Sequence, residues 1–197
     1  MPEWRDLFLS HLQAKWLGLG AGGLKPAWAW VSELNGRAKE ILSIERLRAE
    51  PPQNIYNSLK NLSFPQCPMR IAHLARVNEA PRIVAALVKL LESPGNFEEK
   101  MAAAKFPQAG VVTLTELLGA VKPQRFCIRN TALTRAAAKV VPFYSPRALN
   151  ELPYEEYLDT MRELTFILEA ALRPLGMEEW AKQHRFLALY ASLVEPE

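Results

Sequence analysis

Apolar residues recur at steps of three and four along most of this chain, and proline or glycine interrupts the pattern at short intervals. The first stretch, residues 3–16, places Trp4, Phe8 and Leu12 on one helical face. Fifteen prolines among 197 residues keep such stretches short, because proline lacks an N–H and blocks the preceding helical turn. No stretch shows the sustained alternation of a half-buried strand. The sequence therefore predicts an all-α fold, a compact bundle of about nine short to medium helices joined by Pro-rich turns.

Local signals predict where several helices begin. Asn96 is expected to cap an alanine-rich helix with acids in its first turn. Thr113, followed three residues later by Glu116, has the form of a capping box ahead of a short helix over residues 114–121. Asn130 is expected to cap the helix that runs to Val140.

Other segments are expected to be loops, and one is expected to be an uninterrupted helical stretch. Residues 17–25 are rich in glycine, and residues 63–68 contain two prolines, so both are expected to be loops. A second loop is expected around Pro142 and Pro146, and a single helical stretch is expected from Pro26 to Leu47.

The whole chain, residues 1–197, is expected to form one helical domain. A division into two lobes, 1–93 and 94–197, is the alternative, with a boundary near Glu50–Gln53 or Ser93–Asn96. Neither of those stretches is long enough to be a flexible linker. The residues expected in the core are Trp4, Phe8, Leu87, Leu117, Leu164 and Ile167.

Several kinds of chemistry lack their sequence signals. There is no GxxxxGK[ST] loop to hold a nucleotide and no GxSxG nucleophile. His11, His73 and His184 lie far apart with no second histidine at a helical spacing, so no metal site is expected. No apolar run reaches the roughly 18–20 residues of a membrane span, and no signal peptide is evident.

The cysteines indicate a reducing compartment. Cys67 and Cys127 are far apart and belong to no CxxC pattern, so neither a disulfide framework nor a zinc site is expected, and the cytoplasm is the expected location. Cys127 lies between apolar neighbours, as inert buried thiols do. Arg125 and Arg129 flank it and would favour a reactive thiolate if they lay close to the sulfur.

Basic residues are concentrated in one segment, although the whole chain carries a formal net charge of only +3. Residues 122–147 contain six bases and no acid, whereas residues 151–197 contain ten acids and four bases. The two segments either pair with each other or leave the basic one to face a polyanion. Phe126, Phe143 and Tyr144 lie among the bases, as core anchors or as stacking surfaces.

Residues 109–136 resemble a segment of helical domains of the helix-hairpin-helix type. A glycine-containing turn leads into a short helix with apolar pairs, and then Pro123, Phe126, Ile128 and Asn130 precede another helix. Two groups of proteins share this order: the helix-hairpin-helix DNA glycosylases, and helical N-terminal regions attached to McrB-like AAA+ GTPases of modification-dependent restriction systems. The order leucine pair, Pro, Phe, Ile, Asn is especially similar to the second group.

Departures from the glycosylase pattern imply that base excision is absent. Asn130 stands where these glycosylases carry an aspartate, and an amide cannot take a proton from water or stabilise a cationic sugar as a carboxylate does. Leu114 stands where bifunctional members carry a lysine nucleophile. Gly110 is followed by Val112 rather than a second glycine, and the cysteines of an iron–sulfur loop are missing.

The charge pattern and the resemblance together predict a non-enzymatic domain that binds duplex DNA and recognises a target. The resemblance implies a helix-hairpin-helix-like element near residues 97–140 and membership of a restriction or defence complex, in which a GTPase or nuclease subunit carries the catalysis. The alternative is a protein-interaction or scaffold domain whose basic segment packs on the acidic C-terminal helices. No cofactor and no metal are expected. The predicted DNA-binding residues are Lys122, Arg125, Arg129, Asn130, Arg135, Lys139 and Arg147.

Overall fold

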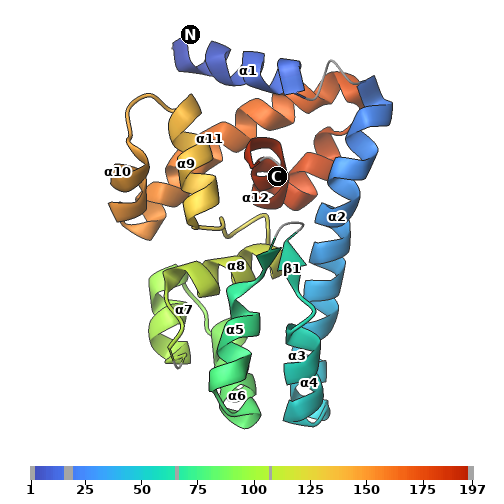
Figure 1. Ribbon diagram of the computed structural model, residues 1–197, viewed down its shortest axis with the longest axis vertical. Helices are drawn as coiled ribbons and strands as arrows, with labels where there is room; N and C mark the ends of the chain where they lie inside the picture. The colour runs from blue at the N-terminus through green and yellow to red at the C-terminus, as the bar shows by residue number, and fades with distance from the viewer. Residues whose placement is uncertain (1–2, 16–19, 65–66, 107, 195–197) are drawn as a thin grey trace.

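The computed structural model describes the chain except residues 1–2, 16–19, 65–66, 107 and 195–197. The described residues form an all-α fold, which confirms the predicted class (Figure 1). Their helices are α1 (Glu3–Lys15), α2 (Gly20–Ile41), α3 (Ile44–Ala49), α4 (Pro52–Leu59), α5 (Arg70–Val77), α6 (Ala80–Glu92), α7 (Phe97–Ala104), α8 (Val111–Val121), α9 (Thr131–Val140), α10 (Pro146–Glu151), α11 (Tyr154–Leu172) and α12 (Glu178–Leu193).

Two further elements are very short. Strands β1 (Ser63–Phe64) and β2 (Cys67–Pro68) form one antiparallel pair within the segment expected to be a loop. A single 3-10 turn, Arg173–Leu175, follows α11. Within the described residues, no helix combines the length and apolar character that a bilayer crossing requires.

The described residues hold twelve α-helices rather than about nine, because serine caps restart the chain where the sequence suggested continuity or a loop. The Oγ atom of Ser43 accepts the backbone N–H of Arg46 at 3.2 Å, which separates α3 from α2. Likewise Ser145 accepts the N–H of Ala148 at 3.1 Å and begins α10 in the segment expected to be a loop. Such caps satisfy N–H groups that have no partner inside the helix.

Of two helix starts predicted from capping signals, the structure confirms one and contradicts the other. Asn96 forms a capping box with Glu99: its side chain accepts the Glu99 N–H at 3.0 Å, and the Glu99 carboxylate accepts the Asn96 N–H at 2.9 Å. The predicted box at Thr113 and Glu116 is wrong, because α8 begins at Val111, three residues before the predicted start, and buries both side chains. The glycine-rich segment also differs from expectation, since α2 begins at Gly20.

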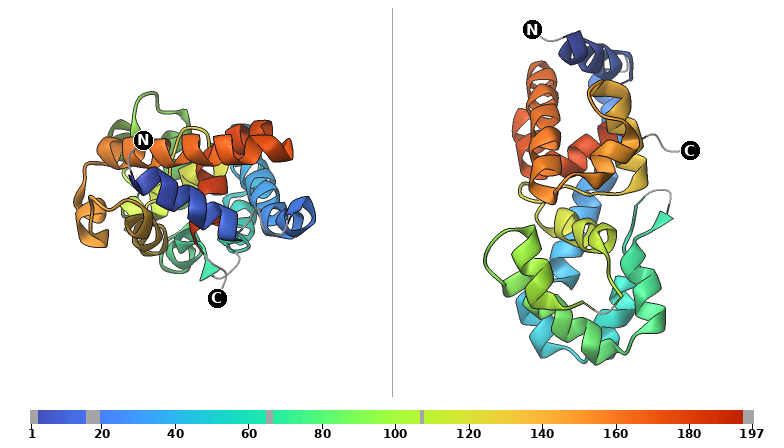
Figure 2. Two further views of the ribbon diagram at one scale, coloured as in Figure 1. Left: turned by 90° about the horizontal axis from the view of Figure 1, so that it is seen from above. Right: turned by 90° about the vertical axis from the view of Figure 1, so that its left-hand side faces the viewer.

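The helices are arranged along an elongated molecule whose two ends do not correspond to the two halves of the chain (Figures 1 and 2). Helices α3 to α7 occupy one end, and α9 to α12 occupy the other. Helix α1 lies with this second group, packed on α11 and α9, and α2 runs along the molecule to contact α8 and α12. Helices α6 and α7, which lie on either side of residues 93–96, pack against each other.

The buried apolar side chains form one continuous cluster that reaches both ends of the molecule. Of the residues expected in the core, Phe8, Leu87, Leu117 and Leu164 are fully buried. Trp4 and Ile167 are partly buried and pack against the same cluster. Helix α8 lies at the centre of the molecule, and its nine residues from Thr113 to Val121 are all buried.

Candidate functional site

The site with the most distinctive chemistry lies at the start of α8. Helix α7 ends at Ala104, and its C-cap residue, Lys105, has a left-handed backbone. Gln108, in the connection to α8, is left-handed too. Gly110 occupies the cap position of α8 in an extended conformation and, having no side chain, caps none of the first-turn N–H groups. The N-terminus of this central helix thus begins without a side-chain cap.

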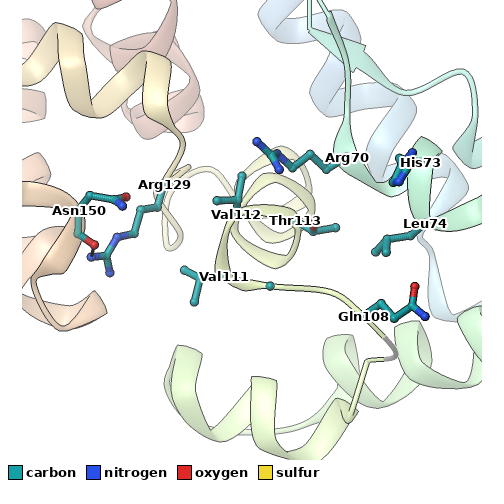
Figure 3. A pocket seen from close by; sticks show the side chains of 10 residues that line it. Arg70, His73, Leu74, Gln108, Val111, Val112, Thr113, Arg129 and Asn150 are labelled. Carbon is teal, nitrogen blue, oxygen red and sulfur yellow. Dashed lines mark hydrogen bonds between the residues drawn. The ribbon is translucent and has the colours of Figure 1, made fainter. Parts of the chain in front are cut away.

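A hollow of about 540 Å³ opens in front of this helix start, as Figure 3 shows. We call it the α8 hollow. Its walls come from α5, from the turn that enters α8, and from Arg129 and Asn150 on the opposite side. Among the described residues, its lining contains no acid; it consists of Arg70, His73, Leu74, Gln108, Gly110, Val111, Val112, Thr113, Arg129 and Asn150.

Arg70 brings a positive charge to the hollow from the first residue of α5. Its side chain is exposed, and in Figure 3 it lies across Val112 from Arg129. The backbone N–H of Arg70 donates to the carboxylate of Glu116 at 3.0 Å, which ties the start of α5 to the side of α8. Neither Arg70 nor His73 belongs to the basic segment, so charge counting along the chain did not find them.

Arg129 lies beside the hollow, but its guanidinium is used inside the protein. The residue is 7% exposed, and its Nη2 atom donates to the backbone carbonyls of Leu149, Asn150 and Leu152, the last at 2.6 Å. These carbonyls lie at the end of α10, where helices leave carbonyls without partners. The guanidinium also lies 5.1 Å from the ring centroid of Tyr157. The interpretation of Arg129 as a phosphate contact is therefore corrected to a structural role.

Asn130 also has a structural role. Its Oδ1 atom accepts the backbone N–H of Leu133 at 2.9 Å, which confirms the predicted cap of α9. Its side chain in addition hydrogen-bonds to the carboxylate of Glu116. Asn130 is only 9% exposed, and its amide is used by these two partners inside the protein.

Glu116 is the buried acid of this region, and it was missed as such in the sequence because it resembled a capping residue. Burial raises the pKa of its carboxyl, while hydrogen bonds from the Arg70 backbone and the Asn130 side chain oppose that rise. Its carboxylate thus joins the start of α5 to the start of α9, where both helix dipoles favour negative charge. It lies behind the hollow and is not among the lining residues.

The other predicted bases have separate surroundings. Arg125 is exposed and donates to the carbonyl of Gly95 at 2.6 Å. Lys100 lies nearby, and its pKa is lowered first by burial and then by the charges of Lys122 and Arg125. Arg147 is exposed and pairs with Glu151 at 2.7 Å, one turn away on α10. The remaining two, Arg135 and Lys139, are exposed on α9.

The acidic C-terminal helices are neutralised mainly by other bases. Arg5 pairs with Glu163 at 3.1 Å, and Arg185 with Glu169 at 2.9 Å. The pKa of Glu178 is lowered to about 2 by hydrogen bonds from Arg173 and then Lys182. Among the described residues, Arg147–Glu151 is the one ion pair between the basic and the acidic segment.

The thiol of Cys127 is fully buried, and burial raises its pKa. Its backbone N–H donates to the hydroxyl of Tyr154 at 2.9 Å, and that hydroxyl donates to the Cys127 carbonyl at 2.7 Å. These contacts favour the inert of the two interpretations. The side chain of Cys67 lies outside the described residues.

Across the described part of the chain, no three His, Cys, Asp or Glu side chains are grouped as metal ligands would be. No protein-family model, curated protein or solved structure matches this chain.

Proposed function

We propose that this protein binds duplex DNA without catalysing a reaction on it, and that the α8 hollow takes a backbone phosphate. The observation that carries the proposal is an uncapped helix start that opens into a hollow whose charged lining is entirely basic. The N–H groups and dipole of a helix N-terminus attract anions. The exposed guanidinium of Arg70 adds a charge suited to phosphate oxygens.

Two bases of the turn after α8, the exposed Arg125 and the half-buried Lys122, support the same partner. Arg125 and Lys122 lie beside each other near Gly95, and no described carboxylate forms an ion pair with either side chain. Phosphate contacts of this kind fix the position of a duplex but do not distinguish its sequence.

The absence of catalysis belongs to the proposal. The described lining of the α8 hollow includes no carboxylate, and the nearby acid, Glu116, lies behind it. Asn130 is a helix cap where the resembling glycosylases carry a catalytic aspartate. The resemblance to McrB-like N-terminal regions extends the proposal to a cytoplasmic restriction or defence complex, in which a GTPase or nuclease partner acts on the DNA that this domain recognises.

The decisive experiment fills the uncapped helix start with a negative charge. A Cβ added at Gly110 would meet nothing within 4 Å, and its backbone is already in the extended conformation of a capping residue. In Gly110→Asp, the new carboxylate would accept first-turn N–H groups and repel phosphate. We expect affinity for a fluorescein-labelled duplex to fall about tenfold or more, with thermal stability unchanged or raised.

Two matched controls isolate the cause. Gly36→Asp adds the same charge within α2, at another glycine with free space around it, and should leave DNA affinity close to that of the parent. Gly110→Ala leaves the N–H groups uncapped and should also bind as the parent does. If Gly110→Asp binds DNA as tightly as both controls, the helix start is not the phosphate site.

A second variant tests the arginine. Arg70→Gln should weaken binding to all duplexes alike and reduce the slope of log affinity against log salt by about 0.9, the share of one phosphate contact. Arg82→Gln, which removes an exposed arginine from α6, is its control. Fluorescence polarisation at two salt concentrations, with duplex and single-stranded DNA, measures the affinity and the salt slope of both variants. A parent protein that shows no salt-dependent binding would overturn the proposal and favour the scaffold alternative.

A further inference from the structure

A second hollow, of about 470 Å³, lies between α1, α9 and the end of α12. We call it the α9 hollow. These three helices come together at the end of the molecule that lies away from α3 to α7 (Figure 1). Its apolar lining includes Ala136, Val140 and Leu193, and Leu7 on the α1 side is 59% exposed. Leu7 thus extends the apolar part of the hollow's edge onto the exposed surface of α1.

The charged lining of the α9 hollow is basic. Arg135 and Lys139 are exposed and lie four residues apart, on the same face of α9. In the described part of the chain, neither side chain has a carboxylate partner, and no acid lines the hollow. Among the described residues, the two cations at the edge of this partly apolar hollow therefore have no anionic counterpart.

We propose that the α9 hollow is a docking site for an acidic amphipathic helix of a partner protein. Such a helix presents apolar side chains on one face and carboxylates beside them, which complements both features of the hollow. Carboxylates four residues apart on the partner would match the spacing of Arg135 and Lys139. The proposal is independent of DNA binding, because the α9 hollow shares no lining residue with the α8 hollow.

The apolar lining distinguishes this partner from DNA. Phosphate oxygens require hydrogen-bond donors, and alanine, valine and leucine side chains offer none, whereas a partner's leucine would lose water on contact with them. The exposed ridge of α9 from Ala132 to Lys139 is about 10 Å long. It therefore accommodates about two turns of a partner helix, an interface of the small, micromolar class.

The test uses a fluorescein-labelled synthetic peptide of about sixteen leucines and glutamates, with leucines at helical spacing on one face. Fluorescence polarisation with the full chain should show binding in the micromolar range. A scrambled peptide of the same composition, and a peptide with lysine in place of glutamate, should bind at least about tenfold more weakly.

Protein variants locate the binding. Arg135→Glu with Lys139→Glu should weaken peptide binding by about tenfold or more, and Leu7→Asp should weaken it as well. The control is Arg82→Glu with Lys89→Glu, which reverses two exposed charges on α6 and should leave binding unchanged. Circular dichroism and thermal melts verify that every variant is folded.

Three results would overturn the proposal. The first is equal binding of the acidic and scrambled peptides. The second is a loss of duplex DNA affinity in the α9 double variant as large as that in Arg70→Gln, which would assign α9 to the DNA surface. The third is light scattering that shows a dimer for the parent and a monomer for the α9 double variant, which would make a second copy of this chain the occupant.

Discussion

Arg129 and Arg135 belong to the same basic segment, yet their surroundings are opposite. Arg129, in the turn before α9, is buried, with its guanidinium against the carbonyls at the end of α10 and over the ring of Tyr157. Arg135, on the outer face of α9, is exposed beside the α9 hollow. A run of basic residues in the sequence therefore need not form a basic surface, because backbone carbonyls without partners compete with external anions for the arginine side chains.

The same contrast separates the two hollows. The α8 hollow combines basic side chains with an uncapped helix start, which suits a phosphate. The α9 hollow combines basic side chains with an apolar lining, which suits an acidic amphipathic helix. Hollows of like charge thus suit different partners according to the groups that lie beside the charge. The following predictions test this comparison.

Replacement of the buried arginine should have the largest effect. Arg129→Ala leaves the carbonyls of Leu149, Asn150 and Leu152 without their donor and removes the contact with the Tyr157 ring. We expect a loss of about 2–4 kcal/mol in the free energy of unfolding, measured by urea denaturation. A loss below about 0.5 kcal/mol would show that the inward contacts contribute little and would reopen a surface role for Arg129.

Loss of the α9 cap should cost less. Asn130→Ala removes the acceptor for the Leu133 N–H and a hydrogen bond to the Glu116 carboxylate. The expected cost is about 0.5–2 kcal/mol by the same denaturation assay. Asn130→Ser, which can still accept the N–H, should recover part of it. Equal stabilities of the Ala and Ser variants would contradict the capping role.

A smaller, pH-dependent difference is expected at Glu116. Burial raises the pKa of this carboxyl, so the folded protein keeps a proton that the unfolded chain releases in the range just above the ordinary pKa of a glutamate. The free energy of unfolding should therefore fall as pH rises through that range. Glu116→Gln keeps an oxygen for the Arg70 N–H but does not titrate, so its stability should fall less over the same range. Parallel pH profiles of the two proteins would contradict this expectation.

The exposed bases of α9 should have the smallest effect on stability. Arg135→Ala with Lys139→Ala removes side chains that have no carboxylate partner among the described residues. The free energy of unfolding should change by less than about 0.5 kcal/mol. Measuring the free energy of unfolding of this variant and of Arg129→Ala compares two parts of one basic segment directly. A large loss of stability in the α9 variant would show that α9 packs through these side chains.

Much of the fold followed from local pattern. The all-α class, the capping box at Asn96, the cap at Asn130 and four buried core residues were predicted correctly, because helical periodicity and capping depend on residues within about four positions. The same local reasoning failed at Thr113 and Glu116. There the form of a capping box occurs inside a helix that is buried among other helices.

The sequence by itself determined that this chain forms short helices and that its bases are concentrated between Lys122 and Arg147. The tertiary structure alone decided which bases face outward. It turned Arg129 to the carbonyls of α10, brought Arg70 from α5 to the start of α8, and left Arg135 beside an apolar hollow. The physical reason is that a side chain's charge is known from its residue type, whereas its partners are backbone and side-chain groups that are distant in sequence and that only folding brings within a few ångströms.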